Sequence, residues 1–263
     1  MKKTTLATKD ADLLEKLIAK YGKVVTANQI EEEARTTWDY QQTHNRIQQL
    51  IKNGWLIRIK RGLYAINDLS SRGYLSISPY VVANLLVAES YVSFEAALHY
   101  RGIFDQYVHQ FSSVSLKQYK ETTLESVQYR FIKSQRNFFV GWEEAEVENM
   151  KANIAYSEKA LVDLIHFRSD TYVIDLVIEK LTNYKEDLNI QSMIDYIHLA
   201  SKKTVKVFGF VFDLLGWDSH KLSLLLAGTR STHRINDNDK VFNAKWRLYY
   251  DGYFDKYQIN RDQ

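Results

Sequence analysis

The spacing of apolar residues changes at Gly54, and this change constrains the fold more than any other feature of the sequence. Before Gly54 the apolar residues recur every three or four positions, which is typical of amphipathic helices. Capping residues divide this part into three short helices. We expect these helices at residues 10–21, 27–34 and 40–53. After Gly54, residues 55–60 and 63–66 alternate in polarity around Arg61-Gly62, which predicts a hairpin with a basic tip. Three helices followed by a hairpin are the element order of a winged helix-turn-helix.

The expected third helix has two contrasting faces. Tyr40, Ile47, Leu50 and Ile51 form its apolar side, whereas the opposite side is polar and carries no acid. Gln, Asn and Arg side chains can read base edges in the major groove, and Lys or Arg on a protruding hairpin can neutralise phosphates. The candidate DNA-binding residues are therefore Tyr40, Gln41, Gln42, Asn45, Arg46, Gln49, Arg58, Lys60 and Arg61.

The distribution of charge singles out the same N-terminal part. Residues 1–66 hold 12 Lys and Arg against 7 Asp and Glu, whereas residues 67–263 hold 23 against 25. A basic block of this kind favours a polyanionic partner. Residues 142–201 are acidic, with 12 acids and 5 bases, and residues 202–247 are basic, with 9 bases and 4 acids. Trp246 lies within the second basic segment and Tyr249 follows it, so the segment is either another polyanion contact or, as we prefer, a solvated basic face.

Composition excludes several classes of protein. The 263 residues contain no cysteine, which excludes disulfides, thiolate metal sites, iron–sulfur clusters and cysteine nucleophiles. No unbroken apolar stretch approaches the roughly 18 residues of a membrane span. The first residues lead into a charged amphipathic segment instead of a signal sequence. We therefore expect a cytoplasmic protein that makes no membrane contact.

The remainder of the chain predicts a second, larger domain. Residues 67–79 are polar and contain the single proline, which places a winged helix-turn-helix domain at 1–70, a linker at 71–79 and a C-terminal domain at 80–263. Within the latter we expect strands at three places and helices almost throughout the part after Ser157. The expected strands lie at residues 111–116, 127–132 and 138–142. The predicted fold class is thus α+β, a winged helix followed by a mostly helical mixed domain.

No pattern of residues indicates catalysis, a metal or a cofactor. The ten glycines form neither a dinucleotide-binding motif nor a phosphate-binding loop, and the histidines show no pair at metal-ligand spacing. Asp218-Ser219-His220 holds triad residue types, but adjacent residues do not converge as a triad must. Glu158 and Asp163 lie five positions apart, which does not stack two carboxylates on one helical face, so we expect them to be structural.

Three segments resemble the AbiEi-type antitoxins and transcriptional regulators of type IV, abortive-infection toxin–antitoxin systems. Residues 54–65, GWLIRIKRGLYA, match the helix-to-wing segment of that family. Residues 91–98, YVSFEAAL, with Gly102-Ile103 after them, match a second family motif, and residues 157–164, SEKALVDL, match a third. The resemblance extends to about residue 165.

This resemblance implies a function that the residue pattern alone does not show. It implies an autorepressor that binds double-stranded DNA near its own promoter, a mode with which a homodimer on an inverted repeat is compatible. It also implies that the C-terminal domain counteracts a co-encoded nucleotidyltransferase toxin without a stable complex, and that both domains share in repression. The alternative is a protein-interaction module that binds a partner directly through residues 80–263, with the winged helix secondary. An enzyme with a DNA-targeting domain is the least favoured hypothesis.

Overall fold

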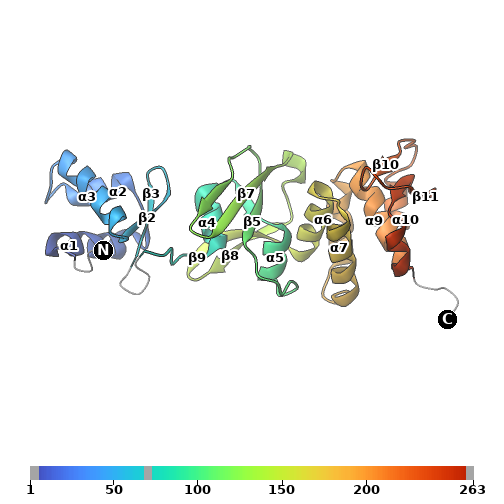
Figure 1. Cartoon of the computed structure of the whole chain (residues 1–263), viewed down its shortest axis with the longest axis horizontal. Coiled ribbons are helices and arrows are strands. Elements are labelled where there is room, and N and C mark those ends of the chain that lie inside the picture. The colour runs from blue at the N-terminus through green and yellow to red at the C-terminus, as the bar shows by residue number, and fades with distance from the viewer. Residues whose placement is uncertain (1–5, 68–72, 259–263) are drawn as a thin grey trace.

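The computed structural model describes residues 6–67 and 73–258, and it is an α+β protein with three β-sheets among those residues. Figure 1 shows three units in a row along the long axis of the molecule: an N-terminal unit of helices and a small sheet, a central sheet, and a mostly helical C-terminal unit. Residues 71 and 72 of the predicted linker lie outside the described residues, and Pro79 is the first residue of the helix that follows the linker.

The N-terminal unit confirms the predicted helices and hairpin. Its elements are α1 (Thr8–Tyr21), β1 (Val24–Thr26), α2 (Ala27–Ala34), α3 (Tyr40–Lys52), β2 (Leu56–Lys60) and β3 (Leu63–Ile66). Thr26 and Asp39 cap α2 and α3, each in a capping box with a glutamine three residues later. The sequence pattern did not reveal β1, because three residues are too few to show an alternation.

The small antiparallel sheet, in the order β1-β3-β2, contributes buried residues to two separate cores. Leu56, Tyr64 and Ile66 pack with the three helices in a core that belongs to the N-terminal unit. Ile59 and Ala65 belong instead to the large core of the central and C-terminal units, where β2 meets the first helix of the central unit. The N-terminal unit therefore packs against the rest of the protein through one face of its own sheet.

The central unit is built on a six-stranded mixed sheet in the order β6-β7-β5-β4-β9-β8. Its elements are α4 (Pro79–Leu86), β4 (Ser90–Val92), α5 (Phe94–Tyr100), β5 (Gln110–Ser115), β6 (Thr122–Leu124), β7 (Val127–Lys133), the 3-10 helix η1 (Arg136–Phe138), β8 (Trp142–Val147) and β9 (Met150–Ala155). The strands predicted at 111–116 and 127–132 are confirmed. The strand predicted at 138–142 is wrong: the buried Phe138 ends η1, residues 139–141 form the connection after it, and only Trp142 belongs to a strand, as the first residue of β8.

The C-terminal unit confirms the helical character predicted after Ser157. Its helices are α6 (Ser157–Phe167), α7 (Thr171–Asn183), α8 (Ile190–His198), α9 (Lys202–Leu214) and α10 (His220–Leu224). They are followed by a second small sheet and a 3-10 helix that were not predicted, namely β10 (His233–Arg234), β11 (Val241–Asn243), β12 (Leu248–Tyr250) and η2 (Gly252–Tyr257). Within the described ranges, no helix is both long and apolar enough to cross a membrane.

Candidate nucleic-acid interface

The outer face of α3 is a stripe of exposed polar side chains. Its residues follow helical spacing and line one side of the helix: Gln41, His44, Asn45, Gln48, Gln49 and Lys52. On the opposite side Thr43, Ile47 and Leu50 are buried, which fixes the rotation of the helix. The helix itself contains no acidic residue. The stripe therefore offers amide, imidazole and ammonium groups to a partner, with no carboxylate to repel phosphate.

Tyr40 and Gln42, at the start of α3, differ in whether their side chains are available to a partner. The sequence pattern placed Tyr40 on the apolar side, but its side chain is 71% exposed, since it lies in the first turn beyond the edge of the core. Gln42 donates its backbone N–H to the Asp39 carboxylate at 2.7 Å, and its side-chain oxygen accepts from the Asp39 backbone N–H at 3.4 Å. Tyr40 is thus available at the surface, whereas the Gln42 side chain stabilises the helix start.

Arg46 lies at the flank of the stripe and contacts three groups of its own unit. Its guanidinium is 3.7 Å from the Asp10 carboxylate of α1, donates to the Gln49 side-chain oxygen at 3.2 Å, and lies over the Trp38 ring at 5.9 Å. Asp10 is only 8% exposed, so this contact ties α3 to α1. In the described structure Arg46 therefore orients the helix.

The basic residues of the hairpin also divide into two groups. Arg58 and Arg61 are exposed, and Arg61 stands at the tip next to Gly62, whose positive φ of 74° the tight turn requires. Lys60 instead donates from Nζ to the backbone carbonyl of Leu86 at the end of α4, at 3.2 Å. A cation at a helix C-terminus is favourable, so Lys60 joins the hairpin to the central unit.

Two members of the stripe were missed by the sequence analysis. His44 and Gln48 lie three and seven positions after Gln41, which is the spacing of one helical face. That spacing was the available signal. Of the predicted residues, the structure brings Gln41, Asn45 and Gln49 together on α3 and places Arg58 and Arg61 on the neighbouring hairpin.

Two of the family-like segments meet in the core of the central unit. Tyr91 and Ser93 donate to the Asp163 carboxylate at 3.2 and 2.6 Å, Lys159 pairs with the same carboxylate, and Lys159 Nζ lies 2.9 Å from the Tyr91 hydroxyl. All four residues have no exposed surface. Burial raises the pKa of Asp163 and lowers that of Lys159, and each charge opposes the shift of the other. The network is closed to solvent, which agrees with the structural role expected for Asp163.

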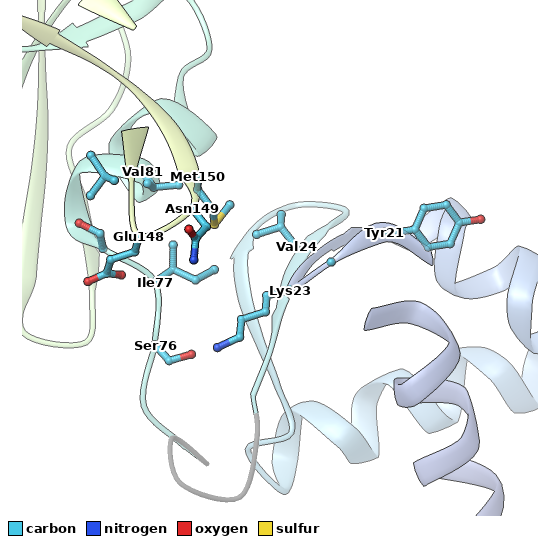
Figure 2. Close-up of a pocket in the computed structure, with 12 residues that line it drawn as sticks. Tyr21, Lys23, Val24, Ser76, Ile77, Val81, Glu148, Asn149 and Met150 are labelled. Carbon is cyan, nitrogen blue, oxygen red and sulfur yellow. The ribbon is translucent and has the colours of Figure 1, made fainter. Parts of the chain in front are cut away.

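A cavity of about 580 Å³ separates the N-terminal unit from the β8–β9 hairpin (Figure 2). Its walls include Lys23 and Val24 on one side, Ile77 of the connecting segment, and Glu148 and Asn149 at the hairpin turn. The contact between the two units is therefore tight where β2 meets α4 and open where β1 faces this hairpin. Among the described residues, no group of His, Asp or Glu side chains is arranged to hold a metal ion.

His166 makes stability depend on pH. Burial, with a smaller contribution from the Lys159 charge, lowers the pKa of His166 to about 4. In the unfolded chain the His166 imidazole binds a proton below about pH 6.5, its ordinary pKa. In the folded protein it does so only below about pH 4. We therefore expect the melting temperature to fall as pH is lowered through this interval, and less steeply in His166→Gln. Thermal melts at pH 7.5 and 5 measure the difference. The exposed His220→Gln should keep the wild-type slope, and an unchanged slope in His166→Gln would contradict the assignment.

The basic segment 202–247 is engaged mainly within the chain. Lys203 donates to the Ile235 carbonyl at 3.1 Å, Lys206 is buried and donates to the Ser231 carbonyl, and Lys245 pairs with Asp213 at 2.7 Å. Trp246 and Tyr250 are core residues. Several cations of this segment remain exposed, namely Lys202, Arg230, Lys240 and Arg247.

Comparison with known proteins supports the fold and does not assign a family. No family model matches the sequence, and no curated protein matches it. A solved structure, the crystal structure of the RV2827C protein from Mycobacterium tuberculosis, is similar with a TM-score of 0.65 at 14% sequence identity. The match covers 95% of this chain and 93% of that chain. At this identity the likeness shows a shared fold over nearly the whole length, and the resemblance to the AbiEi family stays a prediction.

Proposed function

We propose that the protein is a DNA-binding transcriptional repressor whose recognition helix is α3. The observation that carries the proposal is the acid-free, exposed stripe of α3 beside a hairpin with Arg58 and Arg61 at its surface. The element order α1-β1-α2-α3-β2-β3, with the sheet order β1-β3-β2, is that of a winged helix-turn-helix. In such a domain the third helix enters the major groove, which is about 12 Å wide, and the wing contacts the adjacent backbone.

We assign the predicted contact residues different roles within this proposal. Gln41, Asn45 and Gln49 present amide groups suited to adenine and guanine edges, and His44 and Gln48 lie among them. Lys52 and Arg61 are placed at the periphery, where they would neutralise phosphates without reading sequence. Arg46 and Lys60 act indirectly, because their contacts with Asp10 and Leu86 hold α3 and the hairpin in place.

We further propose that repression serves an antitoxin function, directed against a co-encoded nucleotidyltransferase toxin. Support comes from the AbiEi-like segments, two of which meet in one buried network made by Tyr91, Ser93, Lys159 and Asp163. The proposed autorepressor would bind a duplex operator near its own promoter, through both domains, as a homodimer on an inverted repeat. The toxin would be neutralised without a stable complex.

The test is binding of the purified protein to the duplex upstream of its own reading frame, compared with scrambled duplex at several salt concentrations. Asn45→Ala should weaken binding to the upstream duplex by about 5- to 150-fold, because a good bidentate base contact contributes about 1–3 kcal/mol. Arg61→Gln should weaken binding to both duplexes alike and lower the slope of log affinity against log salt by about one.

The matched control is Asn137→Ala, which removes an exposed asparagine from the central unit and should bind like the wild type. Equal losses in Asn45→Ala and Arg61→Gln on both duplexes would contradict the assigned roles. Equal, weak binding of the wild type to both duplexes would overturn the repressor proposal in favour of a protein-interaction module.

A further inference from the structure

The small C-terminal sheet has one buried and one exposed face. Trp246, Leu248 and Tyr250 point into the core, and the Tyr250 ring lies 4.5 Å from that of Phe210 on α9. The residues that alternate with them point outward. The register of the sheet places three of these outward residues side by side, since Tyr249 pairs with Arg234 of β10 on one side and with Phe242 of β11 on the other.

These three residues form a continuous row of contacts in which the Tyr249 and Phe242 ring planes are inclined by 45°, here named the stacking row: Arg234, Tyr249 and Phe242. The Arg234 guanidinium lies 3.9 Å from the centre of the Tyr249 ring, and the Tyr249 and Phe242 ring centres are 4.9 Å apart. Arg234 is held in position because it donates to the Asp239 carbonyl. Phe242 ends the row with 44% of its surface exposed. An apolar ring is thus held at the surface with no covering side chain over much of its area.

Exposed cations lie next to the strands of the stacking row in the sequence. Lys240 directly precedes β11, and Arg247 directly precedes β12 in a turn, where its φ is 49°. Acids lie in the same region: Asp239 directly precedes Lys240, and the Asp251 carboxylate accepts from the Tyr253 backbone N–H at 3.0 Å. Lys240 and Arg247 are thus the exposed cations that directly precede the two strands carrying Phe242 and Tyr249.

We propose that the stacking row binds unpaired bases of a single-stranded nucleic acid. Each base has a π-face that can stack on Phe242 and extend the row, and the exposed Lys240 and Arg247, which directly precede β11 and β12, supply cations for the phosphates. Bases inside a duplex are already stacked on each other, so their faces are not available to such a row. Figure 1 places this sheet at the opposite end of the molecule from α3, so the site is separate from the proposed operator contact.

Anisotropy of 5′-fluorescein-labelled (dT)12 and (rU)12 with the full-length protein tests the proposal. Phe242→Ala should weaken binding by about 5- to 150-fold, because base–aromatic stacking contributes about 1–3 kcal/mol per base. The matched control is Val241→Ala, since Val241 is its neighbour on the same strand, is 40% exposed and points to the opposite face. It should bind within about twofold of the wild type. Arg247→Gln should lower the salt slope by about 0.7, the value for one phosphate of a single strand.

Further measurements distinguish this site from α3 and show whether it prefers DNA or RNA. Asn45→Ala should bind (dT)12 like the wild type, so the result stands even if operator binding fails. Tighter binding of (rU)12 than of (dT)12 would support a site that also contacts the 2′-hydroxyl, and equal binding would support stacking without sugar recognition. The proposal is overturned if the wild type binds neither strand at low salt. It is also overturned if Phe242→Ala, with an unchanged melting temperature, binds as well as Val241→Ala.

Discussion

Replacing Asp163 with alanine should lower the free energy of unfolding by about 3–5 kcal/mol, because it leaves a lysine charge buried without its carboxylate. Lys159 has no exposed surface, and the other groups around it are the Tyr91 hydroxyl and the Phe138 ring, whose centre is 3.7 Å from Nζ. The replacement also leaves the hydroxyls of Tyr91 and Ser93 without their acceptor. Urea denaturation of the full-length protein measures the loss.

A double-mutant cycle gives this prediction its control. Lys159→Met alone should also be strongly destabilising, since it leaves Asp163 charged and unpaired, whereas Lys159→Met with Asp163→Leu should recover most of the loss. An exposed pair provides the surface comparison: Glu144→Ala removes the partner of Lys151 and should leave the unfolding midpoint nearly unchanged. Additive losses in the double variant would show that the two charges do not act as a pair.

Gly209→Ala should destabilise the C-terminal unit by about 1–3 kcal/mol, the usual cost of overpacking a core. A Cβ at this position of α9 would lie 2.2–2.5 Å from three carbon atoms of the Trp246 ring. The ring has little room to move, because Trp246 is 1% exposed and its indole N–H donates to the Asp213 carboxylate at 2.6 Å. Since Trp246 precedes β12, the displaced ring should also disturb the stacking row and weaken binding of (dT)12.

Thermal melts and (dT)12 binding of the same variant measure both effects. Gly252→Ala is the matched control, because the added methyl would make ordinary contacts with the Val241 side chain at 3.4 Å and the Asp255 carboxylate at 3.8 Å. Adding Trp246→Leu should remove most of the penalty of Gly209→Ala relative to Trp246→Leu alone, since the smaller side chain leaves room for the methyl group. A Gly209→Ala protein with wild-type melting and binding would refute the account.

The sequence predicted those elements whose periodicity is long enough to read. Helices α1, α3, α6 and α7 each span eleven residues or more, and their apolar spacing located them. The acidic strand β8 was missed because it lies at the edge of the central sheet, where charged residues replace the alternation of a half-buried strand. Strands β10–β12 have two or three residues each and exist through tertiary pairing.

The same limit applies to the candidate sites: features set by local spacing could be predicted, and features set by contacts between distant segments could not. Exposure of Gln41 and Asn45 follows from helical spacing alone, so the polar face of α3 could be predicted. The engagement of Lys60 with Leu86 could not, because it depends on a contact between residues 26 positions apart in two different units. The stacking row was beyond reach for the same reason, since the register of three short strands brings Arg234, Phe242 and Tyr249 together.

The β1-β3-β2 sheet contributes to two cores, and this limits how the N-terminal unit could be recombined with other proteins. Ile59 and Ala65 complete a core that lies outside the N-terminal unit, so a fragment cut at the junction would carry an apolar surface into water. A chimaera that transplants the N-terminal unit onto another protein would need to bring α4 with it, or supply an equivalent apolar surface. Recombination within this fold is therefore expected to find viable crossover points after α4 and not at the polar connection before it.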